Sequence, residues 1–226
     1  MILLAVSIAP ILLLLIYLYK RDKYEKEPQK LLFKAFIFGA LTVIPILFIE
    51  TWLGDYWDAK YNYIDNKIQT AAFNAFAVAA FTEEFFKYLV FILIVWKNRN
   101  FNEKFDGIIY AVYISLGFAA IENIMYVIGN GMGTGILRAF TAVPAHTMFA
   151  ITMGFLLAKA KFNKKRRAIY LFFSLAAPIM LHGFYDFIIM SQNEALLWVF
   201  FPFLIFMVII AMKQMKILSD ASRFKP

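Results

Sequence analysis

The sequence predicts an all-α polytopic membrane protein, a bundle of about seven transmembrane helices forming one domain over residues 1–226. Apolar residues make up 62% of the chain and charged residues only 17%, whereas soluble domains are roughly half apolar and a quarter charged. Several stretches also run for about 18 residues with almost no charge, the length with which a helix crosses about 30 Å of hydrocarbon. Backbone groups in lipid must bond within their own segment, so these stretches are predicted to be helices.

Seven apolar segments, joined by short connectors, are predicted to be the spans. Trp52, Trp96 and Trp198 lie near predicted span ends, where aromatic side chains are common at the membrane surface. The chain has no cysteine, which excludes thiolate metal sites and cysteine nucleophiles. The predicted spans are residues 2–19, 31–53, 70–96, 107–129, 138–158, 168–190 and 195–212.

Basic residues gather in alternate connectors, and this distribution predicts the orientation in the membrane. Most Lys and Arg residues lie in four segments, residues 20–34, 97–104, 159–167 and 213–226. The connectors of the other side hold only Lys60, Lys67 and Arg138. Because basic connectors stay in the cytoplasm, the N-terminus is predicted outside and the C-terminus inside. The net charge of +8 is therefore explained by topology at the lipid bilayer, and no nucleic-acid partner is predicted.

Ionisable side chains within four of the predicted spans are the main functional signal. A charge near the bilayer centre costs several kcal/mol unless it is paired or hydrated, so its default interpretation is functional. Counted along their helices, Glu122, His146 and His182 lie at about the same depth in the outer half of the membrane. We therefore expect one polar pocket there, formed by Glu83, Glu84, Lys87, Glu122, Asn123, His146, His182 and Asp186.

Helical spacing places these groups in pairs. Lys87 shares a face with Glu83 and Glu84 and is expected to neutralise one of them, leaving the other suited to act as a general base or acid. His182 and Asp186 have the spacing of a carboxylate–histidine pair, which fixes the tautomer of a metal-binding or catalytic ring. Each pair alone is equally well explained as a structural ion pair or an interhelical hydrogen bond. The convergence of so many groups from four helices favours function.

Small residues suggest how the fourth and fifth spans are arranged. Ala142, His146, Ala150 and Gly154 recur every four residues, and such a stripe lets a neighbouring helix approach closely. The glycines within residues 129–135 predict a flexible outer connector between these two spans.

Four motifs together resemble those of the PrsW family of intramembrane proteases. They are Glu83-Glu84-Phe85-Phe86-Lys87, then Phe118-Ala119-Ala120-Ile121-Glu122-Asn123, then His146 with Gly154 eight residues on, and His182-Gly183-Phe184-Tyr185-Asp186. The stretch Tyr24-Glu25-Lys26-Glu27-Pro28 is similar as well. The chain also resembles the broader clan of glutamate-type CAAX-processing and bacteriocin-processing proteases. It departs from that clan by having Glu122 where the clan has His and Asp186 where the clan has Asn, which favours the PrsW family and leaves the need for a metal open.

The resemblance implies an intramembrane endopeptidase of the bacterial plasma membrane. Its implied role is the first, extracytoplasmic (site-1) cut in a single-pass membrane protein, an anti-sigma factor. The residues expected to carry catalysis are Glu83, Glu84, Glu122, His146 and His182, supported by Lys87, Asn123 and Asp186. One of the paired glutamates would activate water, while His146, His182 and Glu122 would bind a divalent metal such as zinc or stabilise the oxyanion.

The alternative hypothesis is an ion- or proton-coupled transporter, which would also need buried carboxylates and histidines. A transport path needs polar groups across the whole membrane and often arises from repeated halves. The predicted cluster is confined to the outer half, and the spans show no duplication. The sequence therefore favours the protease.

Overall fold

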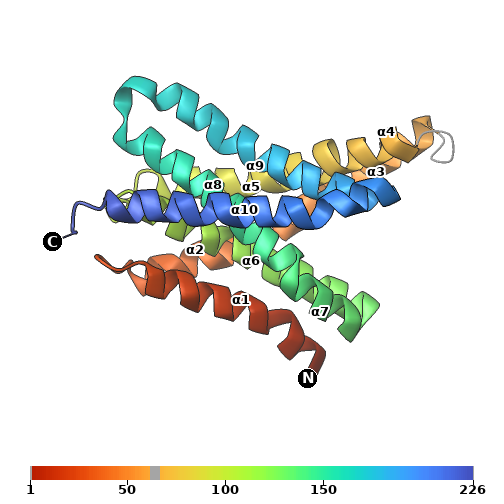
Figure 1. Cartoon of the computed structure of the whole chain (residues 1–226), viewed down its shortest axis with the longest axis horizontal. Coiled ribbons are helices and arrows are strands. Elements are labelled where there is room, and N and C mark those ends of the chain that lie inside the picture. The colour runs from red at the N-terminus through yellow and green to blue at the C-terminus, as the bar shows by residue number, and fades with distance from the viewer. Residues whose placement is uncertain (1, 62–66, 226) are drawn as a thin grey trace.

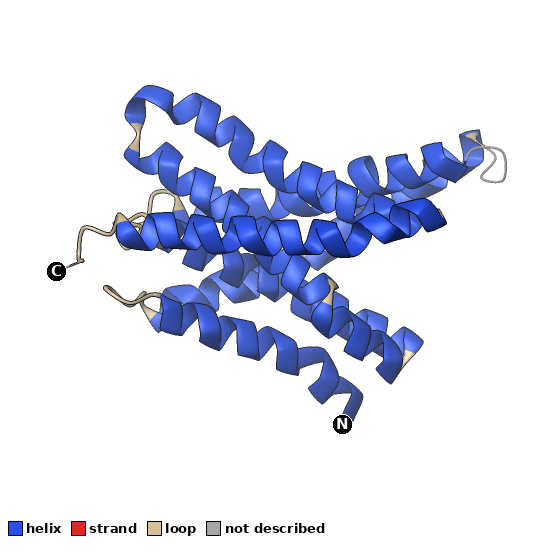
Figure 2. Cartoon of the chain, in the orientation of Figure 1, coloured by secondary structure: helices blue, strands red, loops and turns tan. Residues whose placement is uncertain are grey.

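The computed structural model describes residues 2–61 and 67–225, and within them it contains helices and no strand (Figures 1 and 2). Among these described residues, six helical segments are long and apolar enough to cross a membrane. A further helical run over residues 67–95 takes the place of the third predicted span. The predicted all-α, polytopic fold is confirmed.

The six long segments are formed by eight α-helices. Single helices form four of them, and a short break divides each of the other two into a pair of helices, α2 with α3 and α7 with α8. The bounds are α1 Ile2–Arg21, α2 Gln29–Leu41, α3 Val43–Lys60, α6 Asp106–Asn130, α7 Met132–Phe140, α8 Ala142–Phe162, α9 Arg167–Met190 and α10 Glu194–Asp220, and the short η3 Lys164–Arg166 precedes α9.

The segmented helix over residues 67–95 alternates between α and π geometry. Its parts are α4 Lys67–Ala72, η1 Phe73–Ala80, α5 Phe81–Val90 and η2 Phe91–Val95, with both η parts being π-helices. A π-helix winds more loosely than an α-helix and is often found beside functional sites. Here η1 ends immediately before the turn that carries the paired glutamates.

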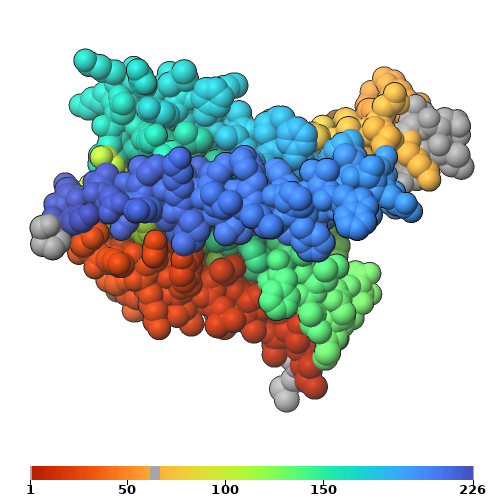
Figure 3. All heavy atoms as spheres, viewed as in Figure 1, coloured from red at the N-terminus to blue at the C-terminus, as the bar shows by residue number. Residues whose placement is uncertain are grey.

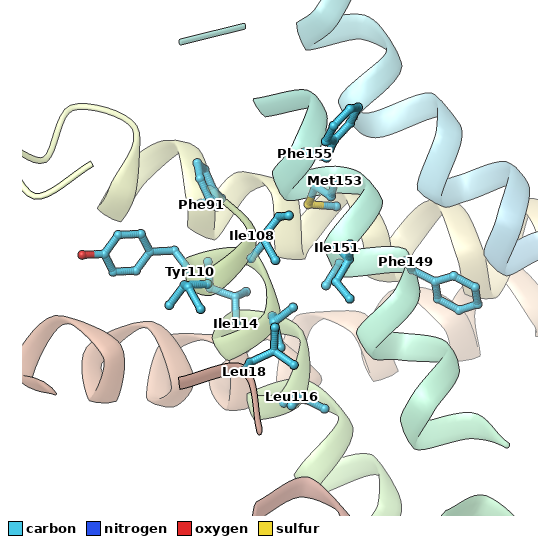
Figure 4. Close-up of a cluster of buried hydrophobic side chains, with 14 of the residues drawn as sticks. Leu18, Phe91, Ile108, Tyr110, Ile114, Leu116, Phe149, Ile151, Met153 and Phe155 are labelled. Carbon is cyan, nitrogen blue, oxygen red and sulfur yellow. The ribbon is translucent and has the colours of Figure 1, made fainter. Parts of the chain in front are cut away.

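Helices α6 and α8 form the interior of the bundle, and most of their residues are buried. Figure 4 shows Ile108, Ile114, Ile151 and Met153 from these two helices in the apolar core. Helix α10 instead crosses one face of the molecule with most of its apolar side chains exposed (Figure 3). An exposed apolar surface of this kind suits contact with lipid.

Glycines allow α6 to lie very close to two neighbours. A Cβ added at Gly154 would lie 2.2 Å from the carbonyl oxygen of Gly107, so α8 and α6 touch through their backbones at this point. A Cβ at Gly117 would lie 2.0 Å from the carbonyl oxygen of Phe36 on α2. The close helix approach predicted for the small-residue stripe is confirmed at Gly154.

The connector after α6 differs from the expected flexible segment. Helix α6 continues to Asn130, only Gly131 leaves the helical path with φ of 84°, and α7 begins at Met132. A left-handed residue favours glycine, and one such residue is enough to reverse the chain here. A second break, at Thr141, then separates α7 from α8.

All four basic segments of the sequence lie at one end of the molecule. In Figure 1 the turn between α1 and α2, the loop between η2 and α6, the turn between α8 and α9 and the end of α10 lie at the left end of the view. The beginning of α1, the turn between α6 and α7, the end of α3 and the beginning of α4 lie at the other end. The alternation of basic connectors therefore corresponds to two physical ends of the bundle.

Candidate active site

Helix α5 turns its polar side toward the interior of the protein. Glu83, Glu84 and Lys87 are buried, whereas Phe81 and Phe85 on the other face are exposed. An α-helix in water has the opposite arrangement, with polar groups outside. In a lipid environment this inversion places the ionisable groups where other protein groups can pair with them.

Lys87 contacts both glutamates of the pair. Its ammonium nitrogen lies 2.8 Å from Glu83 Oε2 and 2.9 Å from Glu84 Oε1. Lys87 thus bonds to both carboxylates, because its i+3 and i+4 positions bring both within reach, although its single charge balances only one of them. The same nitrogen lies 3.5 Å from His146 Nδ1, which connects α5 to α8.

The two histidines are held between carboxylates. His146 Nε2 lies 2.9 Å from Glu122 Oε2. His182 Nδ1 lies 3.1 Å from Glu84 Oε1, and its Nε2 lies 3.2 Å from Asp186 Oδ2, which is the predicted carboxylate–histidine pair. The two rings are nearly perpendicular, with centroids 5.4 Å apart. The structure thus brings together the ionisable residues that the sequence placed in four separate spans.

Apolar and aromatic contacts fix the position of His182. The ring of Phe149 on α8 stacks on the imidazole with centroids 4.7 Å apart. On the next residue, a Cβ added at Gly183 would lie 2.2 Å from a ring carbon of Phe76, which belongs to the π-helix η1. Because Gly183 has no side chain, η1 and α9 come close enough to place His182 beside Glu84.

Arg138 is a member of the site that the sequence did not suggest. Its guanidinium donates to Glu122 Oε2 at 2.7 Å and to Asn123 Oδ1 at 2.8 Å. Asn123 in turn donates to the backbone carbonyl of Ser7 on α1. The predicted fifth span began at residue 138, so Arg138 was expected to lie at the boundary between connector and helix. In the structure α7 begins six positions earlier, at Met132, and Arg138 points from this helix into the site.

A cavity of about 830 Å³ adjoins these residues. Its lining includes Glu83, Glu122, His146, His182 and Asp186, together with residues of α3, α7 and the turn after α9. Glu84 is fully buried and does not line the cavity. The two adjacent glutamates therefore differ, since Glu83 faces the cavity and Glu84 lies behind it.

Glu50 on α3 adds another carboxylate to this cavity. It lines the cavity, and its Oε1 is buried without a hydrogen-bond partner among the described residues. Glu50 lies within the second predicted span, so the search for ionisable residues inside spans should have included it. The site thus contains five carboxylates, those of Glu50, Glu83, Glu84, Glu122 and Asp186, against the two fixed cations Lys87 and Arg138.

The donor atoms of the site fit a divalent metal ion. One ligand atom each from Glu83, Glu84, His146 and His182 lies within 4.8 Å of the others. In addition, Glu84 Oε2 is fully buried and has no hydrogen-bond partner among the described residues. Imidazole nitrogens and carboxylate oxygens are the ligands of catalytic zinc. Glu122, expected as a ligand, is outside this group of four and is engaged by Arg138 and His146.

Comparison with known proteins indicates what such a cluster does. Residues 27–212 match the family described as "PrsW family intramembrane metalloprotease". The chain is 41% identical to "Protease PrsW" of Oceanobacillus iheyensis over 94% of both chains. It is also 36% identical to "Protease PrsW" of Bacillus subtilis, over 89% of this chain and 88% of the relative. No solved structure matches this chain.

Proposed function

The chain belongs to the PrsW family of intramembrane metalloproteases, and on that premise we propose that Glu83, Glu84, His146 and His182 form its hydrolytic centre. As a member of this family the chain is a multi-pass membrane protein that hydrolyses peptide bonds. The observation that carries the proposal is the convergence of these four side chains, from three separate parts of the chain, beside one cavity that Glu83, His146 and His182 line. Membership in a protease family also favours this role over the transporter hypothesis.

Glu83 is the general base in this proposal. It faces the cavity, where water and substrate have access, whereas Glu84 is fully buried. Glu83 takes a proton from the attacking water and returns it to the amine that leaves when the peptide bond breaks. Lys87 lies 2.8 Å from Glu83 Oε2 and holds this carboxylate in place beside the cavity.

Glu84, His146 and His182 would hold the metal ion, which we propose to be zinc. When bound, such an ion lowers the pKa of a coordinated water and polarises the scissile carbonyl. Asp186 fixes the orientation of His182 by accepting a hydrogen bond at its Nε2. Glu122, Arg138 and Asn123 orient His146 from the opposite side.

The oxyanion that forms on the scissile carbonyl needs donors that are already in place. His146 and Arg138 both line the cavity, and both are anchored by Glu122. We assign Arg138 to this role in addition to its positioning of Glu122, because His146 bonds to Glu122 through Nε2 and would use its other ring nitrogen for the metal. Since Arg138 comes from α7, a substrate segment would have to extend between α7 and α5 to reach both the base and this donor.

The position of the cavity supports a cut on the extracytoplasmic side of the membrane. Gly54, Thr134 and Gln192 line it, and they belong to the end of the bundle opposite the basic connectors. With the N-terminus outside, as the basic residues predict, this end faces away from the cytoplasm. A substrate peptide must be extended to be cut, since a helical carbonyl is already bonded. A segment just outside the span of a single-pass protein meets this requirement.

The substrate we propose is a single-pass membrane protein of the anti-sigma factor class, with this chain making the first cut. The test is a cleavage assay with the purified full-length chain and such a substrate in detergent or vesicles. Cleavage should require Glu83, stop with a chelator and resume when zinc is added back. Product ends should map to the extracytoplasmic boundary of the substrate's span. Cleavage within its cytoplasmic half would contradict the proposed orientation.

A further inference from the structure

A second cluster of acidic residues lies at the end of the bundle that carries the basic connectors. Asp22 and Glu27 come from the segment between α1 and α2, Glu103 from the segment before α6, and Asp106 from the first turn of α6. All four carboxylates are buried, with exposed fractions of 3% or less. Asp106 and Glu122 are sixteen positions apart on α6, which separates this cluster from the catalytic one by ~24 Å.

Most of the unpartnered buried side-chain oxygens in the described part of the chain belong to this cluster or to residues next to it in the same segments. Neither carboxylate oxygen of Asp22 has a hydrogen-bond partner there, although only 1% of this residue is exposed. One oxygen each of Glu25, Asn102 and Asp106 is also buried and unpartnered. Buried oxygens of this kind cost free energy unless something satisfies them. Their number indicates an occupant that interacts with oxygen atoms.

Apart from the contact between the Glu27 and Asp106 side chains themselves, the partners of these carboxylates are neutral groups. Asp106 Oδ2 accepts from the backbone N–H groups of Asn102 at 2.8 Å and Glu103 at 2.7 Å. Glu27 accepts from the hydroxyl of Tyr110, which points away from the apolar core in Figure 4. Glu103 accepts from the hydroxyl of Ser222 in the C-terminal tail. Among the described residues, no Lys or Arg forms an ion pair with any of these acids.

The basic residues nearby do not replace a missing cation. The ammonium group of Lys26 bonds to the backbone carbonyls of Tyr19 and Asp22 and leaves the Asp22 carboxylate unpaired. Arg223 is near enough to Glu103 to attract it but forms no ion pair with it within the described residues. The cluster therefore concentrates negative charge inside the most basic end of the molecule.

Burial and the repulsion between neighbouring carboxylates both raise the pKa values of Asp22 and Glu27. Burial, and then the neighbouring carboxylates of Asp106 and Glu103, raise the pKa of Asp22 to about 7 despite the opposing effect of Lys26. Burial and the Asp106 carboxylate raise the pKa of Glu27 to about 9. Carboxylates held together without a cation take up protons more readily, which reduces the repulsion.

We propose that this cluster is a binding site for a hard divalent cation of the Mg²⁺ class, separate from the catalytic centre. Its donors are carboxylate and amide oxygens only, which such cations prefer, whereas the catalytic cluster also offers imidazole nitrogens. The four carboxylates do not converge as tightly as the catalytic donors do. Mg²⁺ does not need all four in direct contact, because it keeps several of its waters and binds through one or two carboxylates.

The bound cation would join three parts of the chain that are distant in sequence. Asp22 and Glu27 belong to the first connector, Asp106 to the start of α6, and Glu103 contacts the C-terminal tail through Ser222. Helix α6 also carries Glu122 and Asn123 of the catalytic site. Occupancy would therefore stabilise the cytoplasmic ends of the helices that position this site, without supplying a catalytic ligand.

Thermal unfolding of the full-length protein in detergent tests this site. After removal of metals with EDTA and dialysis, saturating MgCl₂ should raise Tm by about 5 °C relative to KCl of equal ionic strength, as expected for a ligand well above its Kd. The Asp22→Asn variant should lose this rise. It should also have a higher Tm than the wild type without cation, because the substitution removes a charge that the neighbouring carboxylates of Asp106 and Glu103 repel. The exposed Asp58→Asn variant should keep the full response to MgCl₂.

Two further variants keep the result decisive. His182→Ala should retain the MgCl₂ response, because it alters only the catalytic cluster. If Asp22→Asn does not fold, Glu25→Gln should reduce the response instead. The proposal is overturned if the wild type does not respond to MgCl₂ or CaCl₂, or if the rise persists in Asp22→Asn and disappears in His182→Ala. The last result would locate the cation at the catalytic cluster and leave the proposed protease mechanism intact.

Discussion

The two adjacent glutamates on α5 illustrate how one turn of helix gives identical side chains different roles. Glu83 reaches the cavity, whereas Glu84 points behind it toward His182 and keeps one oxygen unpartnered. The difference follows from the 100° of rotation between neighbouring helical residues, which exposes one to the cavity and buries the other. Access to water suits a base, and a buried oxygen beside an imidazole suits a metal ligand.

Glutamine substitutions separate these roles. Glu83→Gln should lower turnover by about 10²–10⁴-fold, because it removes the base, while bound zinc remains near the wild-type level. Glu84→Gln should lower both turnover and bound zinc, because it removes a ligand. Turnover and zinc per protein chain are the two measurements, and the exposed Glu194→Gln is the matched control. Near wild-type turnover in Glu83→Gln would rule out this residue as the base.

Arg138 should act by positioning Glu122 and His146. Arg138→Gln is expected to lower kcat/KM by about 10–100-fold, the usual effect of removing a partner behind a catalytic group. In a double-mutant cycle with Glu122→Gln, the two effects should be strongly non-additive, because the residues share one ion pair at 2.7 Å. The exposed Arg99→Gln should leave the rate unchanged. Additive effects of the two substitutions would show that the ion pair does not position His146.

At the scale of helices, the backbone contact between α6 and α8 sets the distance between Glu122 and His146. Gly154→Ala would force a Cβ to within 2.2 Å of the Gly107 carbonyl oxygen, and backbone atoms cannot move aside as a flexible side chain can. We expect a loss of about 2 kcal/mol and a fall in Tm of roughly 4–8 °C. Gly133→Ala is the matched control, because a Cβ there meets nothing within 4 Å. Equal Tm values for the two variants would contradict the close packing.

The sequence was sufficient to predict most helices and most site residues, because both depend on strong local signals. The bounds of α6 and α9 differ by at most one residue at either end from the predicted spans 107–129 and 168–190. The ionisable residues inside four spans were recognisable because charge in lipid is so costly. Glu50 would have been found by the same rule applied to the second span.

The π-helices could not be predicted in this way. Residues 73–80 are apolar and favour an ordinary helix, and the wider winding depends on how Phe76 meets Gly183 of α9, more than a hundred residues away.

The position of Arg138 in the candidate site was missed for a related reason. The boundary between connector and helix depends on a single left-handed residue, Gly131, and the sequence offered several glycines in this region without distinguishing among them.

For the molecule as a whole, the buried acids at the basic end predict an unusual dependence of stability on pH. The pKa of Asp22 rises from 3.8 to about 7 on folding and that of Glu27 from 4.5 to about 9. Between these values the folded protein binds protons that the unfolded chain has already released, so stability falls as pH rises. Without divalent cations, Tm of the wild type should therefore decline from about pH 5 to about pH 9 more steeply than Tm of Asp22→Asn. Equal slopes for the two proteins would contradict the raised pKa of Asp22.

The orientation in the membrane links the whole molecule to its proposed role. The cavity belongs to one end of the bundle and the basic connectors to the other, so the topology determines which side of a substrate is cut. A reporter fused to the C-terminus should be active in the cytoplasm, and the loop over residues 163–167 should resist labelling from outside. Labelling of that loop in intact cells would place the cavity on the cytoplasmic side.

The most direct test of the catalytic assignment is a single-turnover cleavage assay on a single-pass membrane substrate, with product ends identified by mass spectrometry. We predict that the wild type and Glu194→Gln cut at the extracytoplasmic boundary of the substrate's span, whereas Glu83→Gln accumulates to the same level, binds zinc and does not cut. Cleavage by Glu83→Gln at the wild-type rate, or cleavage that chelation leaves unchanged, would contradict the assignment of this cluster as a metal-dependent hydrolytic centre.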